Sequence, residues 1–467
     1  MNRKDKNIVG VLLSGGEGKR LWPLSTSFRP KQFIKLGENA LIEQTIRRNN
    51  ALVDEFIAVS NRRYRFLIEQ GFTRAAEKPH RAIYETIGRN TAPAIAFATL
   101  TAQPDDILFA MPTDADIDDL ERYRARVSEA IELAIQDCIV TLGISPTSPH
   151  TGYGYILRSG NDIIRFVEKP TWEKATEYVR SGDYLWNSGM FIFRAQTMIE
   201  ELERHCPDIL QSCREALDAA QTDGGDRAIV LPADRMESIR SESIDYAVIE
   251  KSDRLKVVPS DFSWDDLGSI ESLADTLPQD RERNRVSGDN IILNECKHTS
   301  IVNTGANNLV VANGLSDVVI ANTNDVVYIS KRGRSQDIKD ILSDNEAELG
   351  RYVPANIWND QPWGFYEVLF NTPHYRVRRL TIEPHETAEI DDSAYEMVHF
   401  ISVVGEGAVH TGCDSRRLAA PDSLGVLSEP SLSIENDTDG PLRIIEIAIG
   451  PASEVHDSIR PECGGGR

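Results

Sequence analysis

The chain has 467 residues, enough for two to four domains, and is 40% hydrophobic and 27% charged, a balance that predicts a soluble globular protein. Its 51 Lys and Arg against 73 Asp and Glu give a formal net charge of −22, which disfavours nucleic acid and anionic membrane as partners. Six cysteines lie scattered without a C-x-x-C pair, and no run reaches the roughly 18 apolar residues of a membrane span, so we expect reduced thiols and a cytoplasmic location.

Residues 1–280 alternate apolar strands with amphipathic helices. The predicted strands include IVGVLLS, EFIAVS, DILFAMP and DCIVTLGI, and stretches such as ALIEQTIRRNNAL predict the helices between them. This alternation is typical of an α/β fold with a doubly wound, mostly parallel sheet. Ligands of such sheets bind beyond the carboxyl ends of the strands. We therefore expect the site where IVGVLLS and DILFAMP end.

A glycine-rich turn with two cations, GGEGKR at residues 15–20, follows the first predicted strand. Because glycine lets backbone N–H groups approach an anion closely, the turn is a candidate cradle for phosphates. It is not a P-loop, which would need Gly at Leu13, nor a dinucleotide fingerprint, which would need Gly at Leu21. By itself the stretch is also compatible with a turn whose cations lie in water.

Two carboxylates are candidate metal ligands. Asp114 follows the apolar strand ILFAM, and Asp266 lies beside Asp265 in DFSWDDLGS. From one sheet edge, two carboxylates could hold Mg²⁺, which takes one or two carboxylates together with substrate phosphate oxygens. The alternative is that each Asp is a loop or helix-capping residue.

Three further motifs are candidate binding segments, and two of them, FVEKP and WNSGMF, suit a phosphorylated sugar. In FVEKP, Glu168 can accept from sugar hydroxyls while Lys169 faces the phosphate. Asn187 precedes a strand in WNSGMF, and Lys31 follows a proline in RPKQF. Taken alone, each motif also fits a solvated pair or a plain turn.

The C-terminal part changes in character. From about residue 285 to 330, short Val- and Ile-rich runs alternate with Asn and Gly, which predicts a short β-solenoid-like segment, and a helix follows. The remainder is again β-rich and predicts a small β-sandwich or barrel. We expect three parts, at residues 1–280, 281–350 and 351–467.

The order of motifs resembles that of the sugar-phosphate nucleotidyltransferases. The motifs are GGEGKRLWPLS, RPKQF, GRNTAPA, MPTDAD, GYGYI, FVEKP, WNSGMF, SIDYAVIEKS and WDDLGS. More narrowly, the chain resembles the long bacterial mannose-1-phosphate guanylyltransferases, which carry a C-terminal mannose-6-phosphate isomerase-like domain. The resemblance covers nearly the whole chain, and it implies a nucleotidyltransferase domain over 1–280 and a cupin-like β-barrel over 351–467.

The resemblance also implies roles for individual residues. The catalytic set is Arg20, Lys31, Asp114 and Asp266, and the last two would bind Mg²⁺, with Asp265 the weaker choice. The nucleotide set is Gly15, Gly16, Gly18, Glu85 and Asn90. The sugar-phosphate set is Gly152, Glu168, Lys169 and Asn187.

The implied substrates are GTP and mannose 1-phosphate, whose phosphate would attack the α-phosphate of GTP in line. Glu85 is the candidate reader of guanine, because a carboxylate can accept from both N1–H and N2–H₂. A homo-oligomer is compatible with the sequence. Two alternatives stay open: a nucleotidyltransferase for another hexose 1-phosphate, and a catalytically silent sugar-nucleotide sensor.

The C-terminal part departs from the isomerase pattern. The resemblance implies a metal bound by a Gln, two His and a Glu, but the Glu position holds Val398 and the last His position holds Leu432. The cluster of His has become DDSAYE, at residues 391–396. We therefore expect this part to keep the fold without isomerase activity.

Overall fold

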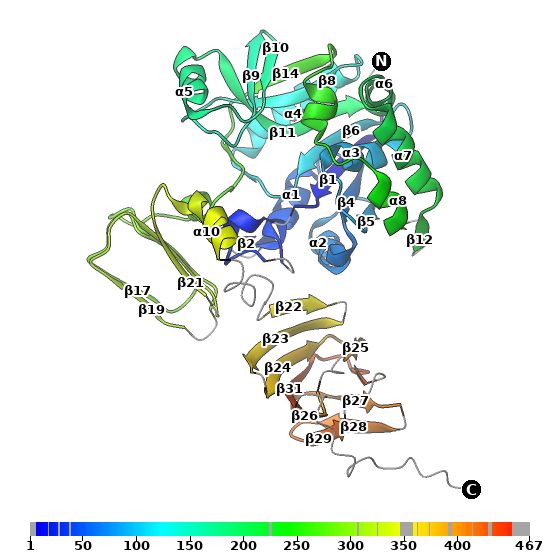
Figure 1. Ribbon diagram of the computed structural model, residues 1–467, viewed down its shortest axis with the longest axis vertical. Coiled ribbons are helices and arrows are strands. Elements are labelled where there is room, and N and C mark those ends of the chain that lie inside the picture. Colours follow the sequence, from blue (N-terminus) through cyan, green and yellow to red (C-terminus); the bar gives the residue numbers. More distant parts are fainter. Residues whose placement is uncertain are drawn as a thin grey trace. The chain divides into compact units, whose positions relative to one another are not determined.

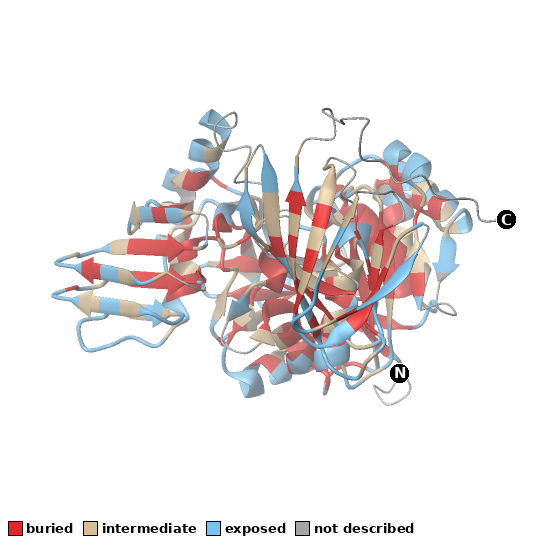
Figure 2. Cartoon of the chain, turned by 90° about the horizontal axis from the view of Figure 1, so that it is seen from below, coloured by how far each residue is buried: buried red, intermediate tan, exposed pale blue. Residues whose placement is uncertain are grey.

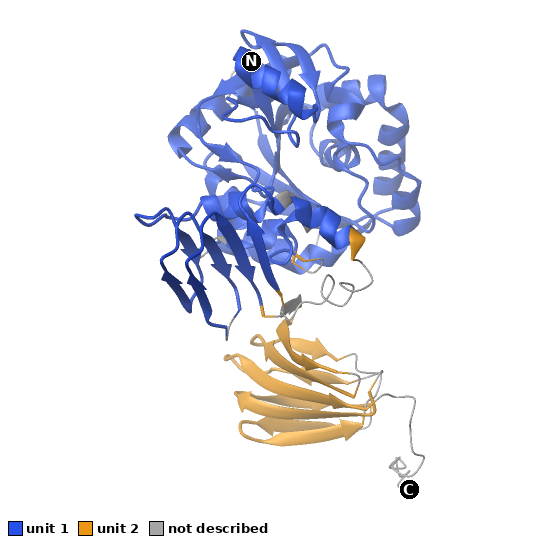
Figure 3. Ribbon diagram, turned by 60° about the vertical axis from the view of Figure 1, so that its left-hand side comes forward, with its two compact units in different colours: residues 1–25, 30–323, 327–343 blue, residues 26–29, 324–326, 344–467 orange. Residues whose placement is uncertain are grey.

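The computed structural model describes residues 6–16, 18–26, 29–36, 39–223, 227–305, 308–324, 326–345, 358–361, 363–372, 374–390, 395–412, 414–427 and 432–450. The chain forms two compact units (Figures 1 and 3). The first comprises residues 1–25, 30–323 and 327–343, and the second comprises residues 26–29, 324–326 and 344–467. None of the helices in the described ranges has the length and apolar character needed to cross a membrane.

An 11-stranded mixed sheet forms the centre of the first unit, in the order β12-β13-β5-β4-β1-β6-β11-β8-β14-β10-β9. Five neighbouring strands are parallel: β13 (Ala228–Val230), β5 (His80–Glu85), β4 (Glu55–Asn61), β1 (Ile8–Ser14) and β6 (Ile107–Pro112). β8 (Ile139–Ile144) and β14 (Leu255–Ser260) are also parallel. The remaining strands are antiparallel to their neighbours: β9 (Tyr155–Ser159), β10 (Asp162–Val167), β11 (Tyr184–Arg194) and β12 (Gln221–Asp223).

The expectation of a mostly parallel sheet is therefore right for the strands around β1 and wrong for β11. This strand of 11 residues runs antiparallel between β6 and β8. Eight of its 11 positions are buried. The sequence does not reveal the direction of such a strand, because a strand covered on both faces is a continuous apolar run whichever way it points.

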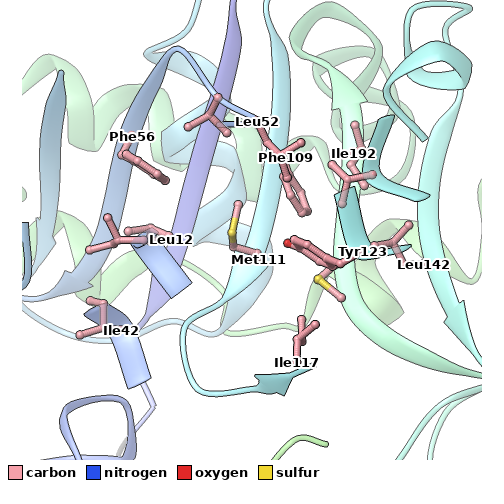
Figure 4. Close-up of a cluster of buried hydrophobic side chains, with 14 of the residues drawn as sticks. Leu12, Ile42, Leu52, Phe56, Phe109, Met111, Ile117, Tyr123, Leu142 and Ile192 are labelled. Atoms are coloured by element: carbon pink, nitrogen blue, oxygen red, sulfur yellow. The ribbon is translucent and has the colours of Figure 1, made fainter. Parts of the chain in front are cut away.

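Helices cover both faces of this sheet, because β1 sends alternate side chains to opposite sides. Ile8 and Leu12 join one core, and Val9 and Val11 join the other. Figure 4 shows part of the first core, where Leu12, Phe109 and Tyr123 lie together. The strands at the centre are largely buried (Figure 2).

Each core has its own helices. On the face of Leu12 lie α1 (Leu41–Asn49), α2 (Arg65–Ala75), α4 (Leu120–Ala134) and α5 (Trp172–Ser181). On the face of Val9 lie α3 (Thr91–Leu100), α6 (Ala195–His205), α7 (Pro207–Asp218), α8 (Ala233–Ser238) and the π-helical turn η5 (Asp245–Ile249). The first unit also contains several short helices and strands: η2 (Lys19–Leu21), η3 (Lys31–Phe33), β2 (Lys35–Leu36), β3 (Asn39–Ala40), η4 (Arg62–Tyr64), β7 (Asp116–Ile117), β15 (Trp264–Asp265) and α9 (Ile270–Asp275).

Residues 285–331 form two ladders around a small apolar core. One ladder is parallel through β16 (Arg285–Ser287), β18 (Ser300–Asn303) and β20 (Val318–Asn322), and β21 (Val327–Lys331) joins it antiparallel. The other pairs β17 (Ile291–Asn294) with β19 (Val310–Asn313) in parallel. Cys296, Ile301, Ala312 and Ile320 are buried between them, and η6 (Ser335–Asp337) and α10 (Ile338–Asp344) follow.

The second unit contains two antiparallel sheets that share one core. The larger holds β22 (Trp358–Gln361), β23 (Gly364–Asn371), β24 (Tyr375–Ile382), β31 (Leu442–Ile449), β26 (Met397–Val404) and β29 (Ser423–Leu427). The smaller holds β25 (Thr387–Glu389), β30 (Ser433–Glu435), β27 (Glu406–His410) and β28 (Ser415–Ala419). Leu380 and Phe400 from one sheet and Val409 and Ile434 from the other are buried in the same cluster.

A matched pair of isoleucines tests the packing of the central sheet. Ile192 on β11 is 0% exposed, whereas Ile164 on β10 is 61% exposed. We expect Ile192→Ala to lower the free energy of unfolding by about 2–5 kcal/mol, since it removes apolar contacts and leaves a cavity. Ile164→Ala should change it by no more than about 0.5 kcal/mol. Denaturant unfolding followed by tryptophan fluorescence makes the comparison, and equal effects would contradict this packing.

Candidate active site

A cavity of about 370 Å³ opens beyond the carboxyl ends of β1 and β5. Four of the five residues expected to bind the nucleotide line it: Gly15, Gly16, Glu85 and Asn90. The sheet edge predicted from the sequence is therefore the edge that is hollowed.

Hydrogen bonds fix the turn that enters this cavity. The carbonyl of Ser14, the last residue of β1, accepts from Gln32 Nε2 at 3.1 Å and from Ser60 Oγ at 2.8 Å. On the neighbouring turn, the Arg89 guanidinium donates to the carbonyls of Met236 and Glu237. Both turns are thus held by side chains from other elements.

Two oxygens on the cavity wall lack hydrogen-bond partners among the described residues. They are Glu85 Oε1 and Ser14 Oγ, both buried. Burial raises the pKa of Glu85 to about 8, because the charged form loses its hydration. A buried carboxyl oxygen without a hydrogen-bond partner is a candidate for binding a ligand.

The fifth residue, Gly18, packs against Lys31. Its φ is +65°, and a Cβ atom there would lie 2.6 Å from Cβ of Lys31. Glycine alone meets both requirements without strain. The glycine-rich turn therefore packs directly on the backbone of a predicted catalytic lysine.

Lys31 joins the two predicted metal ligands. Its Nζ lies 2.8 Å from Asp114 Oδ2 and also donates to the backbone carbonyl of Asp266. The pairing of β7 with β15 brings these segments together, with Asp116 opposite Asp265. The structure thus gathers Asp114, Asp266 and Lys31 from three distant segments.

The two neighbouring aspartates differ in their surroundings. Asp266 Oδ1 accepts from the Tyr153 hydroxyl at 2.7 Å and from Gly268 N–H at 3.0 Å. Asp265 Oδ1 accepts from Leu267 N–H at 2.6 Å, and burial raises the Asp265 pKa to about 6. In the part of the chain that the structure describes, no three His, Cys, Asp or Glu side chains converge as a metal site. The Asp114 carboxylate and the Asp266 backbone both meet the Lys31 ammonium, and the carboxylate oxygens of these two residues are of the kind that Mg²⁺ accepts as ligands.

The residues expected to bind the sugar phosphate also converge. Lys169 Nζ lies 2.9 Å from Glu168 Oε1, and a Cβ on Gly154 would come within 2.6 Å of Glu168 Oε2. Lys169 has a φ of +45°, an uncommon backbone conformation that is enriched at functional sites. Gly152 N–H donates to His150 Nδ1 at 3.2 Å.

Asn187 links this group to the cavity. Its Oδ1 accepts from Thr141 Oγ1 at 2.9 Å, and its Nδ2 donates to Asp245 Oδ1 at 3.2 Å. Asp245 lines the cavity, and burial, followed by the charge of Glu168, raises its pKa to about 6. Arg20 lies apart from these contacts, exposed in η2, where its charge lowers the pKa of His150 after the larger effect of burial.

Two residues of this site were missed in the sequence. Asp245 lies in SIDYAVIEKS, to which the sequence assigns no role, and Tyr153 lies in GYGYI, of which only Gly152 is an expected site residue. Asp245 could have been identified from the sequence, because it is an acidic residue within a mostly apolar run. Tyr153 gave no such signal, because its contact with Asp266 spans 113 positions.

The histidines of the second unit have separate partners. His399 Nε2 lies 3.2 Å from the Met397 sulfur, and His410 Nε2 lies 3.0 Å from Glu435 Oε2. Val398 and Leu432, at the expected ligand positions, are buried in the apolar core. Residues 391–394 of the altered cluster lie outside the described residues.

Comparison with known proteins agrees with this geometry. The nucleotidyl transferase family matches residues 9–283, and the mannose-6-phosphate isomerase C-terminal family matches residues 355–462. The chain belongs to the nucleotidyl transferase family. Enzymes of this family generally use divalent metal ions.

Relatives of this nucleotidyl transferase match it along its whole length. It is 35% identical to a mannose-1-phosphate guanylyltransferase of Klebsiella pneumoniae, over 97% of this chain and 98% of the relative. It is 36% identical to the xanthan biosynthesis protein XanB of Xanthomonas campestris, over 99% of both. The family resemblance seen in the motifs is therefore confirmed.

Two solved structures are also similar to this nucleotidyl transferase. A Thermus thermophilus protein titled mannose-1-phosphate geranyltransferase is 31% identical with a TM-score of 0.63, over 73% of this chain and 99% of that one. A Helicobacter pylori protein titled mannose-6-phosphate isomerase is 34% identical with a TM-score of 0.51, over 56% of this chain and 99% of that one.

The Tyr153 hydroxyl offers a test of how Asp266 is held. We expect Tyr153→Phe to lower nucleotidyl transfer by about 10-fold to 100-fold, the size of a hydrogen bond to a charged group. Tyr123→Phe is the control, since it removes a buried hydroxyl that donates to Asn49 at 2.9 Å outside the site. It should lower stability while leaving turnover within a few-fold. Equal turnover in the two variants would show that Tyr153 does not position Asp266.

Proposed function

We propose that the protein is a mannose-1-phosphate guanylyltransferase, which converts GTP and mannose 1-phosphate into GDP-mannose and pyrophosphate. The observation that carries this proposal is the Lys31–Asp114–Asp266 cluster, which lies at the same sheet edge as a cavity with a buried acid. Full-length relatives carry this name.

In the proposed reaction, a phosphate oxygen of mannose 1-phosphate attacks the α-phosphorus of GTP. The bond from this phosphorus to the bridging oxygen breaks, and the electron pair leaves with pyrophosphate. Arg20 and Lys31 offset the negative charge of the triphosphate, with Lys31 nearest the α-phosphate. No general base is required, because the attacking phosphate is already ionised.

Asp114 and Asp266 would hold Mg²⁺ in this scheme. When bound, the ion neutralises charge on the phosphate oxygens and orients them. Asp114 is one-third exposed and can turn from Lys31 toward a ligand, whereas Tyr153 and Gly268 hold Asp266 in place.

The two substrates would be read by different residues. Gly15, Gly16, Gly18 and Asn90 would contact the nucleotide, and Glu85 would accept from guanine N1–H and N2–H₂, a contact worth about 1–3 kcal/mol of discrimination. The sugar phosphate would meet Gly152, Glu168, Lys169 and Asn187. Another hexose 1-phosphate is the second candidate, because epimers differ by a single hydroxyl.

The proposal extends to organisation and location. The parallel ladders of residues 285–331 support a short solenoid between a catalytic domain at 1–280 and a cupin-like domain at 351–467, with 281–350 as the middle part. A cytoplasmic enzyme would have access to its nucleoside triphosphate, and a homo-oligomer is compatible with this proposal.

Pyrophosphate release tests the activity directly. The purified protein is mixed with Mg²⁺, GTP and mannose 1-phosphate, and then with ATP or glucose 1-phosphate in place of one substrate. The largest kcat/KM should belong to GTP with mannose 1-phosphate. A preference for another sugar would favour the second candidate, and release from no pair would support the silent sensor.

The metal ligands predict a specific pattern of variants. Asp114→Ala and Asp266→Ala should each lower kcat by about 100-fold or more, because each removes a carboxylate that holds the ion. Asp265→Ala is the matched neighbour and should be milder. Measurement of kcat over a range of Mg²⁺ concentrations makes the comparison. Near-normal turnover in either of the first two variants would remove that residue from the metal site.

The second unit should lack isomerase activity. Interconversion of mannose 6-phosphate and fructose 6-phosphate needs a base and an electrophile that stabilises the enediolate. Val398 and Leu432 cannot bind a metal as Glu and His would. We expect no interconversion with added Zn²⁺, Co²⁺ or Mn²⁺ while guanylyl transfer proceeds. Metal-dependent isomerase activity that is lost on truncation near residue 355 would contradict this.

A further inference from the structure

Glu85 ends β5 with its carboxyl on the cavity wall. The residue is 4% exposed, and Oε1 has no hydrogen-bond partner among the described residues. The same wall carries the buried Ser14 hydroxyl, which also lacks a partner there. Both residues border the cavity, so a ligand that enters it can offer hydrogen bonds to them.

The surroundings of Glu85 favour its neutral form. Burial is the larger influence on its pKa, which rises to about 8, and the backbone N–H of Arg89 is the one described group that opposes it. Asp245 from η5 lines the same cavity. On α7, burial raises the pKa of the Cys213 thiol, and the negative charge of Glu85 raises it further. The Arg89 guanidinium is engaged by the carbonyls of Met236 and Glu237.

The two forms of a carboxyl group match different bases. A carboxylate offers two acceptors, which suit the N1–H and N2–H₂ donors of guanine. A carboxylic acid offers one donor and one acceptor, which suit N1 and N6–H₂ of adenine. The base that fits thus depends on whether the proton is present.

We infer that Glu85 releases a proton when guanine binds, so that the protonation state of this one carboxyl decides between GTP and ATP. The inference rests on the proposed function and adds a mechanism for its base specificity. Low pH keeps Glu85 neutral and weakens the preference for guanine. The preference for GTP grows as the pH rises, because the carboxylate that fits guanine replaces the acid that fits adenine.

The ratio of kcat/KM for GTP to that for ATP, measured from pH 6 to 8.5 with mannose 1-phosphate, tests this. Because the two nucleotides share the triphosphate, its own protonation cancels in the ratio. We expect this ratio to rise by about tenfold per pH unit from pH 6 to 8.5, because each rise in pH increases the carboxylate that fits guanine relative to the acid that fits adenine. A ratio that stays constant with pH in the wild-type protein would overturn the inference.

Glu85→Gln is the matched variant, because its amide permanently offers one donor and one acceptor. It should show a low ratio that does not change with pH, close to that of the wild type at pH 6. A pH-dependent ratio in this variant would assign the titration to another group and overturn the inference. The wild-type series decides alone if the variant does not fold.

Proton release on binding separates this inference from the proposed activity. Calorimetric titration with GTP at pH 7, in two buffers of different ionisation enthalpy, should show that the wild type releases more protons than Glu85→Gln, by up to about one per site. Guanylyl transfer without this difference would reject the inference and keep the activity. The difference without any transfer would keep the inference and reject the activity.

Discussion

The ammonium of Lys31 holds the site together electrostatically. It lies against the carboxylate of Asp114 and the backbone carbonyl of Asp266, which come from separate segments of the first unit. In a protein with a net charge of −22, such a cation is what allows acidic groups to gather where an anionic substrate must bind. The glycine-rich turn depends on the same residue, because Gly18 packs against its Cβ.

The rest of the site extends from this cluster in two directions. Toward β5 the cavity ends at Glu85, a buried acid without a cationic partner among the described residues. Toward β9 and β11, Glu168 and Asn187 form a polar group that contacts or faces Asp245. The cavity thus has a buried acid on one wall and, at Asp245, a link to the polar group of Glu168 and Asn187.

Much of this arrangement follows from the sequence. Strands with continuous apolar runs identified β1 and β6, and the rule that ligands bind at the carboxyl edge placed Gly15 and Asp114 correctly at one end of the sheet. The direction of β11 did not follow, because a buried strand has no polar pattern that marks its orientation. The pairing of β7 with β15 did not follow either, since two-residue strands carry too little pattern to recognise.

Contacts between distant segments set the same limit on the site. Tyr153 donates a hydrogen bond to Asp266, and Asp245 accepts one from Asn187. No local sequence pattern predicts such contacts. The sequence did indicate which ligand positions of the second unit hold Val398 and Leu432, and both are core residues there. The sequence therefore shows which residue occupies each motif position, but it does not show which residues from distant segments contact one another.

The role of the Lys31 charge is tested most directly by the single-turnover rate of GDP-mannose formation. This rate is measured for Lys31→Met at saturating Mg²⁺, GTP and mannose 1-phosphate. Methionine keeps much of the length and apolar stem of lysine but removes its charge. We expect the rate to fall by about 100-fold or more, since a charge that stabilises the transition state is lost. Calorimetry should show that GTP still binds. A rate within a few-fold of the wild type would contradict the central place of Lys31.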